Sequence, residues 1–183
     1  MDTVGKENSE ILGQKEIVVP KDVARAFGSG LEQLISSMLQ QIIFSSLRGN
    51  IVPIKIERDV QEITKVLDGF ERAGVVRILP FVGGNEIQFL EETERKDPTE
   101  PGEVVMNKNI TPAFISALHH ALRNPLFKIS GRAEDIKSED GKKIYNACNG
   151  IKEVLESFDN AQQIEIATDT AGNTKLKPLR TSN

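Results

Sequence analysis

The residue types most often used in catalysis are sparse in this chain of 183 residues. Its two histidines, His119 and His120, are adjacent. Neighbouring helical residues point about 100° apart, so this pair is poorly suited to share one metal ion. Cys148 is the single cysteine and lies between Ile144 and Ile151 in a helical apolar pattern, which is typical of a buried, unreactive thiol. These residues therefore predict no metal centre and no nucleophile.

Carboxylates are more numerous, and Asp135, Glu139 and Asp140 fall close together. Any two of them could meet in a loop to hold a cation or to perform acid–base chemistry, but nothing fixes that geometry and the spacing of an EF-hand loop is absent. A cleft that held two or more of His119, His120, Asp135 and Glu139 would indicate an enzyme. Without such a pattern in the sequence, we predict a non-enzymatic protein with no cofactor and no small-molecule substrate.

Composition narrows the class of protein further. The chain has 23 Lys and Arg against 27 Asp and Glu, so its net charge of −4 gives no general attraction to nucleic acid. No apolar run approaches the roughly 18 residues of a membrane span. A single cysteine cannot form an internal disulfide, and the first seven residues lack the pattern of a secretory signal. We therefore expect a cytoplasmic protein without a membrane partner.

Apolar periodicity places several elements in the first part of the chain. Residues 17–19 predict a short strand, and residues 20–27 predict a brief helix. We expect Gly28 and Gly30 to interrupt this helix, since glycine is unfavourable inside helices. Ser29, with a glutamate three residues later, forms a capping box and predicts the start of a long helix.

A strand, a helix and a hairpin are predicted to follow. Residues 51–56 are typical of an edge strand, because Pro53 cannot donate a ladder hydrogen bond. Asp59 forms a second capping box and predicts a helix that ends near residue 74. Two β-prone runs then flank a Gly-Gly pair within residues 82–85, which predicts a β-hairpin across residues 75–90.

The second half is separated from the first by residues 91–103, which are acidic and rich in Pro and Gly and predict a linker. Beyond it we expect a strand at 104–106 and a helix from Thr111 that Asn124-Pro125 ends. The remaining expected elements are a strand at 127–129, a charged loop at 131–141, a helix at 144–158 and a strand at 163–166.

Together these elements predict an α+β fold of small mixed helices and short antiparallel strands. We expect two halves, a winged-helix-like unit at 16–90 and an α/β unit at 104–167, joined by the acidic linker. The polar termini, residues 1–15 and 168–183, are predicted to be flexible.

Residues 31–90 resemble a winged-helix domain. The resemblance rests on the sequence Phe70-Glu71-Arg72-Ala73-Gly74-Val75-Val76 followed by the expected hairpin, where a helix closes on glycine and runs into a two-stranded wing. It implies DNA binding through a helix at 59–73, with an additional basic edge. The candidate basic residues are Lys55, Arg58, Lys65, Arg72 and Arg77. That helix carries four acidic and two basic residues, however, which opposes contact with phosphates.

Apolar side chains at two places favour a protein partner instead. The last turns of the long helix are apolar on all faces, and the expected hairpin turn is uncharged. The candidate interface residues are Ile43, Phe44, Leu47, Phe81 and Val82. We therefore predict a protein-interaction or assembly subunit, either a homo-oligomer or a component of a larger complex. The alternative is a winged-helix-like DNA-binding regulatory protein.

Overall fold

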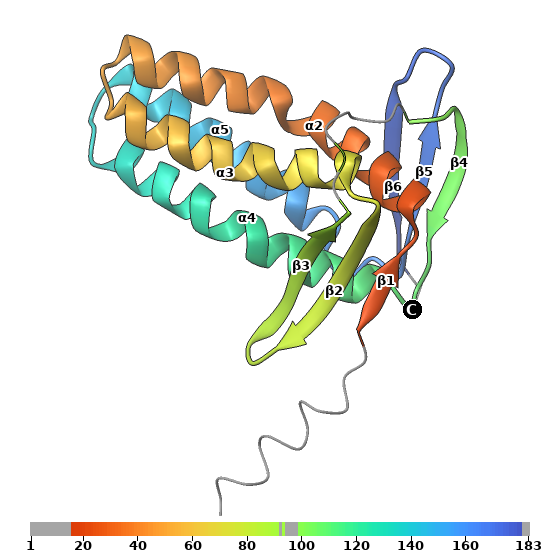
Figure 1. Ribbon diagram of the computed structural model, residues 1–183. Coiled ribbons are helices and arrows are strands. Elements are labelled where there is room, and N and C mark those ends of the chain that lie inside the picture. Colours follow the sequence, from red (N-terminus) through yellow and green to blue (C-terminus); the bar gives the residue numbers. More distant parts are fainter. Residues whose placement is uncertain (1–15, 92, 94–98, 181–183) are drawn as a thin grey trace, which may run out of the picture.

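The computed structural model describes residues 16–91, 93 and 99–180. Within these residues, four helices and six strands form a mixed α+β fold, as the sequence predicts. The helices lie side by side in a bundle, and both sheets lie towards the end at which α2 begins (Figure 1). Segment 1–15 and residues 92 and 94–98 of the expected linker lie outside the described residues.

In chain order the elements are β1 (Ile17–Val19), α2 (Lys21–Arg48), α3 (Pro53–Arg72), β2 (Val75–Phe81), β3 (Gly84–Leu90), β4 (Gly102–Met106), α4 (Thr111–Glu134), α5 (Glu139–Glu156), β5 (Gln163–Thr168) and β6 (Thr174–Leu179). They form two antiparallel sheets, ordered β1-β2-β3 and β4-β5-β6. Each half of the chain thus contributes two helices and one sheet.

The β2–β3 hairpin agrees with the expectation for residues 75–90. Val76 pairs with Phe89 and Phe81 pairs with Gly84, which leaves a two-residue turn of Val82 and Gly83. Gly83 has a φ of 107°, a conformation that glycine adopts without steric cost. The hairpin directly follows α3, which is the order that the winged-helix resemblance implies.

Helix α2 runs without a break through Gly28 and Gly30, so the interruption and the restart at Ser29 expected from the sequence are wrong. These glycines serve close packing. A Cβ at Gly28 would lie 2.5 Å from the Cβ of Phe70 on α3, and a Cβ at Gly30 would lie 2.7 Å from Leu176 on β6. The close packing of α3 and β6 against α2, which the missing Cβ atoms allow, offsets the low helix propensity of glycine.

Helix α3 replaces the edge strand expected at residues 51–56. Pro53 lies in the first turn of the helix, where its missing N–H costs nothing and its fixed φ is favourable. The helix therefore begins six residues before Asp59, and the expected cap at Asp59 is also wrong. Asp59 instead lies fully buried within the helix, where its carboxylate pairs with Arg132 of α4.

Helix α4 continues past Asn124-Pro125, so the expected stop is wrong, and so are the strand at 127–129 and most of the charged loop at 131–141. Pro125 is buried and the helix runs on to Glu134. Its second half contributes Leu126 and Ile129 to the core. Burial of these side chains compensates for the backbone hydrogen bond that Pro125 cannot make.

The expected flexible tail at 168–183 contains β6, which pairs with β5 from Thr174 to Leu179. This prediction was wrong because an alternating pattern at 174–179 was not recognised. The Gln33 side chain on α2 also fixes the β5–β6 turn. Its amide nitrogen donates to the carbonyl of Gly172 at 2.9 Å, and its oxygen accepts from the N–H of Thr174 at 2.8 Å.

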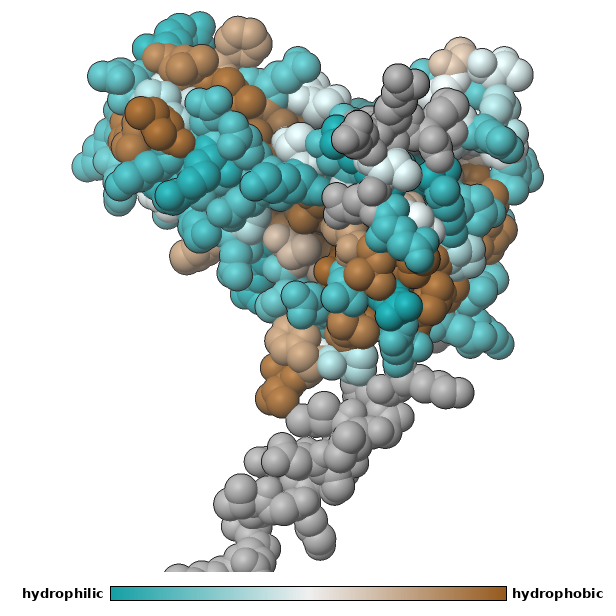
Figure 2. Space-filling model, viewed as in Figure 1, coloured by the Kyte–Doolittle hydropathy of each residue, from teal (hydrophilic) through white to brown (hydrophobic). Residues whose placement is uncertain are grey.

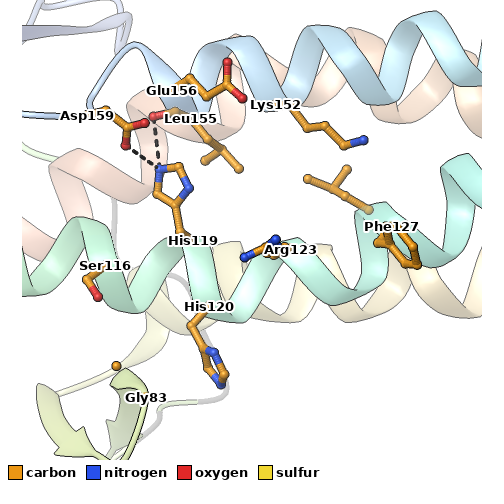
Figure 3. A pocket seen from close by; sticks show the side chains of 12 residues that line it. Gly83, Ser116, His119, His120, Arg123, Phe127, Lys152, Leu155, Glu156 and Asp159 are labelled. Carbon is orange, nitrogen blue, oxygen red and sulfur yellow. Dashed lines mark hydrogen bonds and ion pairs between the residues drawn. The ribbon is translucent and has the colours of Figure 1, made fainter.

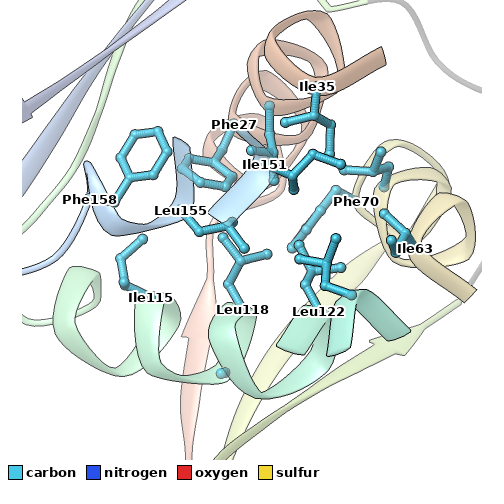
Figure 4. Close-up of a cluster of buried hydrophobic side chains, with 14 of the residues drawn as sticks. Phe27, Ile35, Ile63, Phe70, Ile115, Leu118, Leu122, Ile151, Leu155 and Phe158 are labelled. Atoms are coloured by element: carbon cyan, nitrogen blue, oxygen red, sulfur yellow. The ribbon is translucent and has the colours of Figure 1, made fainter. Parts of the chain in front are cut away.

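Phenylalanine rings join the two halves in one hydrophobic core (Figure 4). The ring of Phe27 on α2 lies edge-on to Phe114 on α4 and to Phe158 after α5, at centroid distances of 4.8 and 5.6 Å. Phe70 on α3 contacts Phe114 at 5.4 Å. Edge-to-face pairs of this kind add stability beyond the area they bury. The two halves of the chain, each with its own sheet, therefore share one hydrophobic core.

Candidate functional site

Four hydrophobic side chains are exposed where α2 ends and α3 begins. The exposed fractions are 72% for Phe44, 59% for Leu47, 43% for Val52 and 81% for Ile54. We call these residues the bundle-end patch, because they lie at the end of the bundle farthest from the sheets (Figure 1). Figure 2 shows hydrophobic side chains gathered at this end of the molecule. Phe44 and Leu47 were expected to be buried by the chain or by a partner, and the described chain leaves both exposed.

The turn that carries the patch is held in a strained conformation. Val52 has a φ of 37° and a ψ of 53°, which is left-handed and unfavourable for a β-branched residue. Asn50 is also left-handed, with a φ of 50°. Between them, Ile51 is buried, and its N–H donates to the carbonyl of Ser46 at 2.9 Å. The burial of Ile51 thus holds Val52 outward.

Charges of both signs border the patch. Arg48 forms an ion pair with Asp140 of α5 at 2.7 Å. On the first turns of α3, Lys55, Glu57 and Arg58 are all exposed. A hydrophobic centre with a mixed polar rim is the arrangement found in protein interfaces.

The other predicted interface residues are not part of this patch. Ile43 is half-buried against the core. Val82 is 76% exposed at the hairpin turn, while Phe81 is half-buried and its ring lies 4.8 Å from the ring of His120. The structure therefore separates the hairpin turn from the bundle-end patch (Figure 1). Val52 and Ile54 were missed because their segment was interpreted as a strand.

A cleft of about 520 Å³ lies between α4 and α5, with the β2–β3 turn at its rim. It contains His119 and His120, so it satisfies the condition stated above for considering an enzyme. Asp135 and Glu139 lie elsewhere, at the end of α4 and the start of α5. Figure 3 shows the two histidines pointing in different directions, His119 towards α5 and His120 towards the hairpin, as their helical spacing predicts.

His119 is held by two acceptors. Its Nε2 lies 3.1 Å from the Asp159 carboxylate and 3.3 Å from the carbonyl oxygen of Leu155 (Figure 3). Both partners accept hydrogen bonds, so the geometry assigns a hydrogen to Nε2. Asp159 was missed because it is forty residues away in the sequence. Neither partner is a nucleophile, so the contacts in the described chain do not assemble a catalytic triad.

The remaining polar side chains of the cleft come from facing helices. Arg123 lies on α4, one turn after His119, and Lys152 lies on α5 with Glu156 one turn further on. Phe127 follows Arg123 by one turn and is 72% exposed. Nothing in the sequence alone indicated that these residues meet, because their pairing depends on how α4 packs against α5.

Cys148 is buried, as expected, and does not reach this cleft. Burial away from water disfavours the thiolate and raises the pKa of the Cys148 thiol to about 12, although nearby Lys152 lowers it slightly. The thiol is therefore protonated at neutral pH and is a poor nucleophile.

The predicted basic edge is only partly assembled. Arg58, Lys65 and Arg72 recur every seven residues and share one face of α3. Arg77 lies on β2 and pairs with Glu16 at 3.0 Å, while Lys55 lies one turn before Arg58 on α3. Over its whole length α3 has four basic and five acidic residues, so no net positive surface results.

Among the described residues, no group of three or more His, Cys, Asp or Glu side chains is placed to hold a metal ion. No helix in the same part of the chain has the length and hydropathy needed to cross a membrane. Comparisons with protein families, with curated proteins and with solved structures found no significant match to this chain.

Proposed function

We propose that this protein is a non-enzymatic interaction subunit that self-associates through the bundle-end patch. The observation that carries the proposal is the exposure of Phe44, Leu47, Val52 and Ile54 at one end of the bundle. Burial of these grouped apolar side chains by a partner is favourable, because it removes their surface from water.

The strained turn supports the proposal independently. A left-handed conformation at a β-branched residue costs free energy, and such strain is found preferentially at functional sites. At Val52 the strained turn leaves a hydrophobic side chain 43% exposed, so this side chain is only partly buried within the chain. Burial of Val52 in an interface would remove the rest of it from water.

The rim favours a second copy of this chain as the partner. In a two-fold interface the same patch of one copy contacts that patch of the other copy, so the charges within the patch must be able to pair with one another. The basic Lys55 and Arg58 alternate with the acidic Glu57 beside the patch, and such a mixture allows opposite charges to meet across a two-fold axis. A partner of strongly acidic or basic character would instead favour a rim of one sign.

The size of the patch sets the expected strength. A stable interface buries about 800 Å² on each partner, from roughly 20 or more residues. The bundle-end patch has four hydrophobic residues, so the proposed association is weak and depends on protein concentration.

Analytical ultracentrifugation of the whole chain tests the proposal. Between about 10 µM and about 1 mM, the mean mass of the wild-type protein is expected to rise towards that of a dimer. Phe44→Asp and Ile54→Asp are expected to stay folded and monomeric, since both positions are exposed. Val82→Asp is the matched control, equally exposed but at the hairpin turn, and should associate as the wild type does. A monomeric wild type over the whole range would overturn the proposal.

A second candidate function is binding to nucleic acid through the exposed face of α3. The observation that favours it is the alignment of Arg58, Lys65 and Arg72 on one face. Such binding would weaken steeply with salt and would be reduced by Lys65→Gln. Salt-independent or absent binding to a duplex would reject this candidate.

A further inference from the structure

The cleft between α4 and α5 has the size of a small-molecule site. Its volume of about 520 Å³ lies within the range of about 300–1,000 Å³ typical of ligand pockets. The lining is more polar than that of a typical pocket, with seven polar side chains beside the apolar Leu126, Phe127 and Leu155, which suits a charged ligand. It is separate from the bundle-end patch and shares no residue with it.

Two cations face the cleft from opposite helices. Arg123 projects from α4 and Lys152 from α5 (Figure 3). Within the described chain neither has an ion-pair partner, whereas other basic side chains such as Arg48 and Arg132 do. Two cations without ion-pair partners in one concavity provide charged hydrogen-bond donors for an anion from both sides. An arginine also presents two parallel donors to a carboxylate or a phosphate.

Two acidic residues, Glu156 and Asp159, line the same cleft and balance the two cations in formal charge, but within the described chain neither acid forms an ion pair with Arg123 or Lys152. Asp159 is engaged by His119 at 3.1 Å. Glu156 lies on the exposed rim, one turn beyond Lys152 on α5. The carboxylate of Glu156 is an acceptor, so a hydroxyl group on the ligand could donate to it.

The apolar part of the lining adjoins the cations. Phe127 is 72% exposed one turn after Arg123, and the buried Leu126 directly precedes it on α4. A ring on the ligand could therefore pack on Phe127 while the charged group reaches Arg123, since residues four apart lie on the same face of a helix.

We propose that this cleft binds a small organic anion, a phosphate monoester or a carboxylate joined to a flat apolar group. The anionic group lies between Arg123 and Lys152, and the apolar group packs on Phe127. The role is binding only, and it concerns a different surface from the proposed self-association.

Titration of the whole chain by NMR and calorimetry tests this site. The probes are phenyl phosphate and benzoate, with phenol as the uncharged control and inorganic phosphate as the control without a ring. We expect phenyl phosphate, benzoate or both to bind with a Kd of about 1 mM or tighter, and phenol to bind more weakly. The tighter of the two anions identifies the class of charged group.

Variants separate the two parts of the site. Arg123→Gln and Lys152→Gln are each expected to weaken the aromatic anion about tenfold, because each removes a charged hydrogen bond. Lys108→Gln, at an exposed lysine before α4, should leave binding unchanged. Phe127→Ala should weaken phenyl phosphate but not inorganic phosphate. Circular dichroism checks that each variant is folded.

Two results would overturn the inference. One is the absence of binding by both aromatic anions up to about 10 mM. The other is binding that Arg123→Gln and Lys152→Gln leave unchanged. Because Phe44→Asp alters only the bundle-end patch, that variant should bind the anion as the wild type does. A failure of self-association therefore leaves the result for the cleft intact.

Discussion

The carboxylate of Asp59, which is fully buried on α3, forms an ion pair with the guanidinium group of Arg132 on α4. A second guanidinium group, that of Arg58, lies 4.0 Å from the same carboxylate. A buried carboxylate is stable only when it is paired, because its removal from water is costly. The pair thus links a helix from each half of the chain. Because the Asp59 carboxylate is not exposed, water cannot replace Arg132 as its partner.

We expect Arg132→Met to lower the free energy of unfolding by about 3–5 kcal/mol, since it leaves the buried Asp59 carboxylate without its main partner. Urea denaturation followed by circular dichroism measures the loss. The matched control is Lys128→Met, which breaks the pair of Lys128 and Glu62 between the same two helices. That pair is 3.5 Å long and largely exposed, so its loss should cost less than about 1 kcal/mol. Equal losses in the two variants would contradict this account.

The position of Asp59 illustrates how local sequence signals can mislead. An aspartate with a glutamate three residues later is typical of a helix start, and here it lies in the second turn of α3. The competing signal was already present, because Ile56 extends the apolar stripe of Val60 and Ile63 upstream of Asp59, and all three are buried. Pro53 was assigned to an edge strand although it is equally favourable at the start of a helix.

Other elements depended on contacts between distant segments. Gly28 is tolerated within α2 because Phe70 lies against it, and Pro125 is tolerated within α4 because the turns around it are buried. The hairpin was predictable because glycine is required locally, at the turn residue Gly83. Phe44 and Leu47 were identifiable from sequence as apolar residues on the outer faces of a helix. The cleft was not, because it joins side chains of α4 and α5 that no local pattern relates.

We expect Gly28→Ala to destabilise the protein by about 1–3 kcal/mol, the usual cost of forcing extra volume into a packed core. The added Cβ would lie 2.5 Å from the Cβ of Phe70, which cannot move without shifting α3. Gly131→Ala is the matched control, since it also lies within a helix but has no heavy atom within 4 Å of the added Cβ. It should stabilise the protein by about 0.5–1 kcal/mol through helix propensity. Thermal unfolding distinguishes the two, and a stabilised Gly28→Ala would show that α2 and α3 are not so closely packed.

We expect the Cys148 thiol to resist alkylation in the native state and to react once the protein unfolds. Burial raises its pKa from the ordinary value of 9.0 to about 12 in the folded protein. The folded state therefore favours the protonated thiol. The corresponding stability is fully present below pH 9.0 and is lost as pH rises towards about 12.

The measurement is the difference in unfolding free energy between the wild type and Cys148→Ala at several pH values. This difference should be constant at neutral pH and should shift against the wild type in alkaline solution. Rapid modification of the native wild type by iodoacetamide at neutral pH would contradict the predicted burial.

We expect Val52→Asn to make the isolated chain more stable and its self-association weaker. Asparagine adopts the left-handed conformation more readily than a β-branched residue, so the substitution relieves strain of about 1 kcal/mol at a φ of 37°. It also removes a hydrophobic side chain from the bundle-end patch, which lowers the free energy gained on burial by a second copy. Urea denaturation at low protein concentration measures the first effect, and sedimentation across a concentration series measures the second. Opposite changes in the two quantities would indicate that valine is retained at this position for the interface rather than for the fold. A variant that is both more stable and equally associated would place Val52 outside the interface.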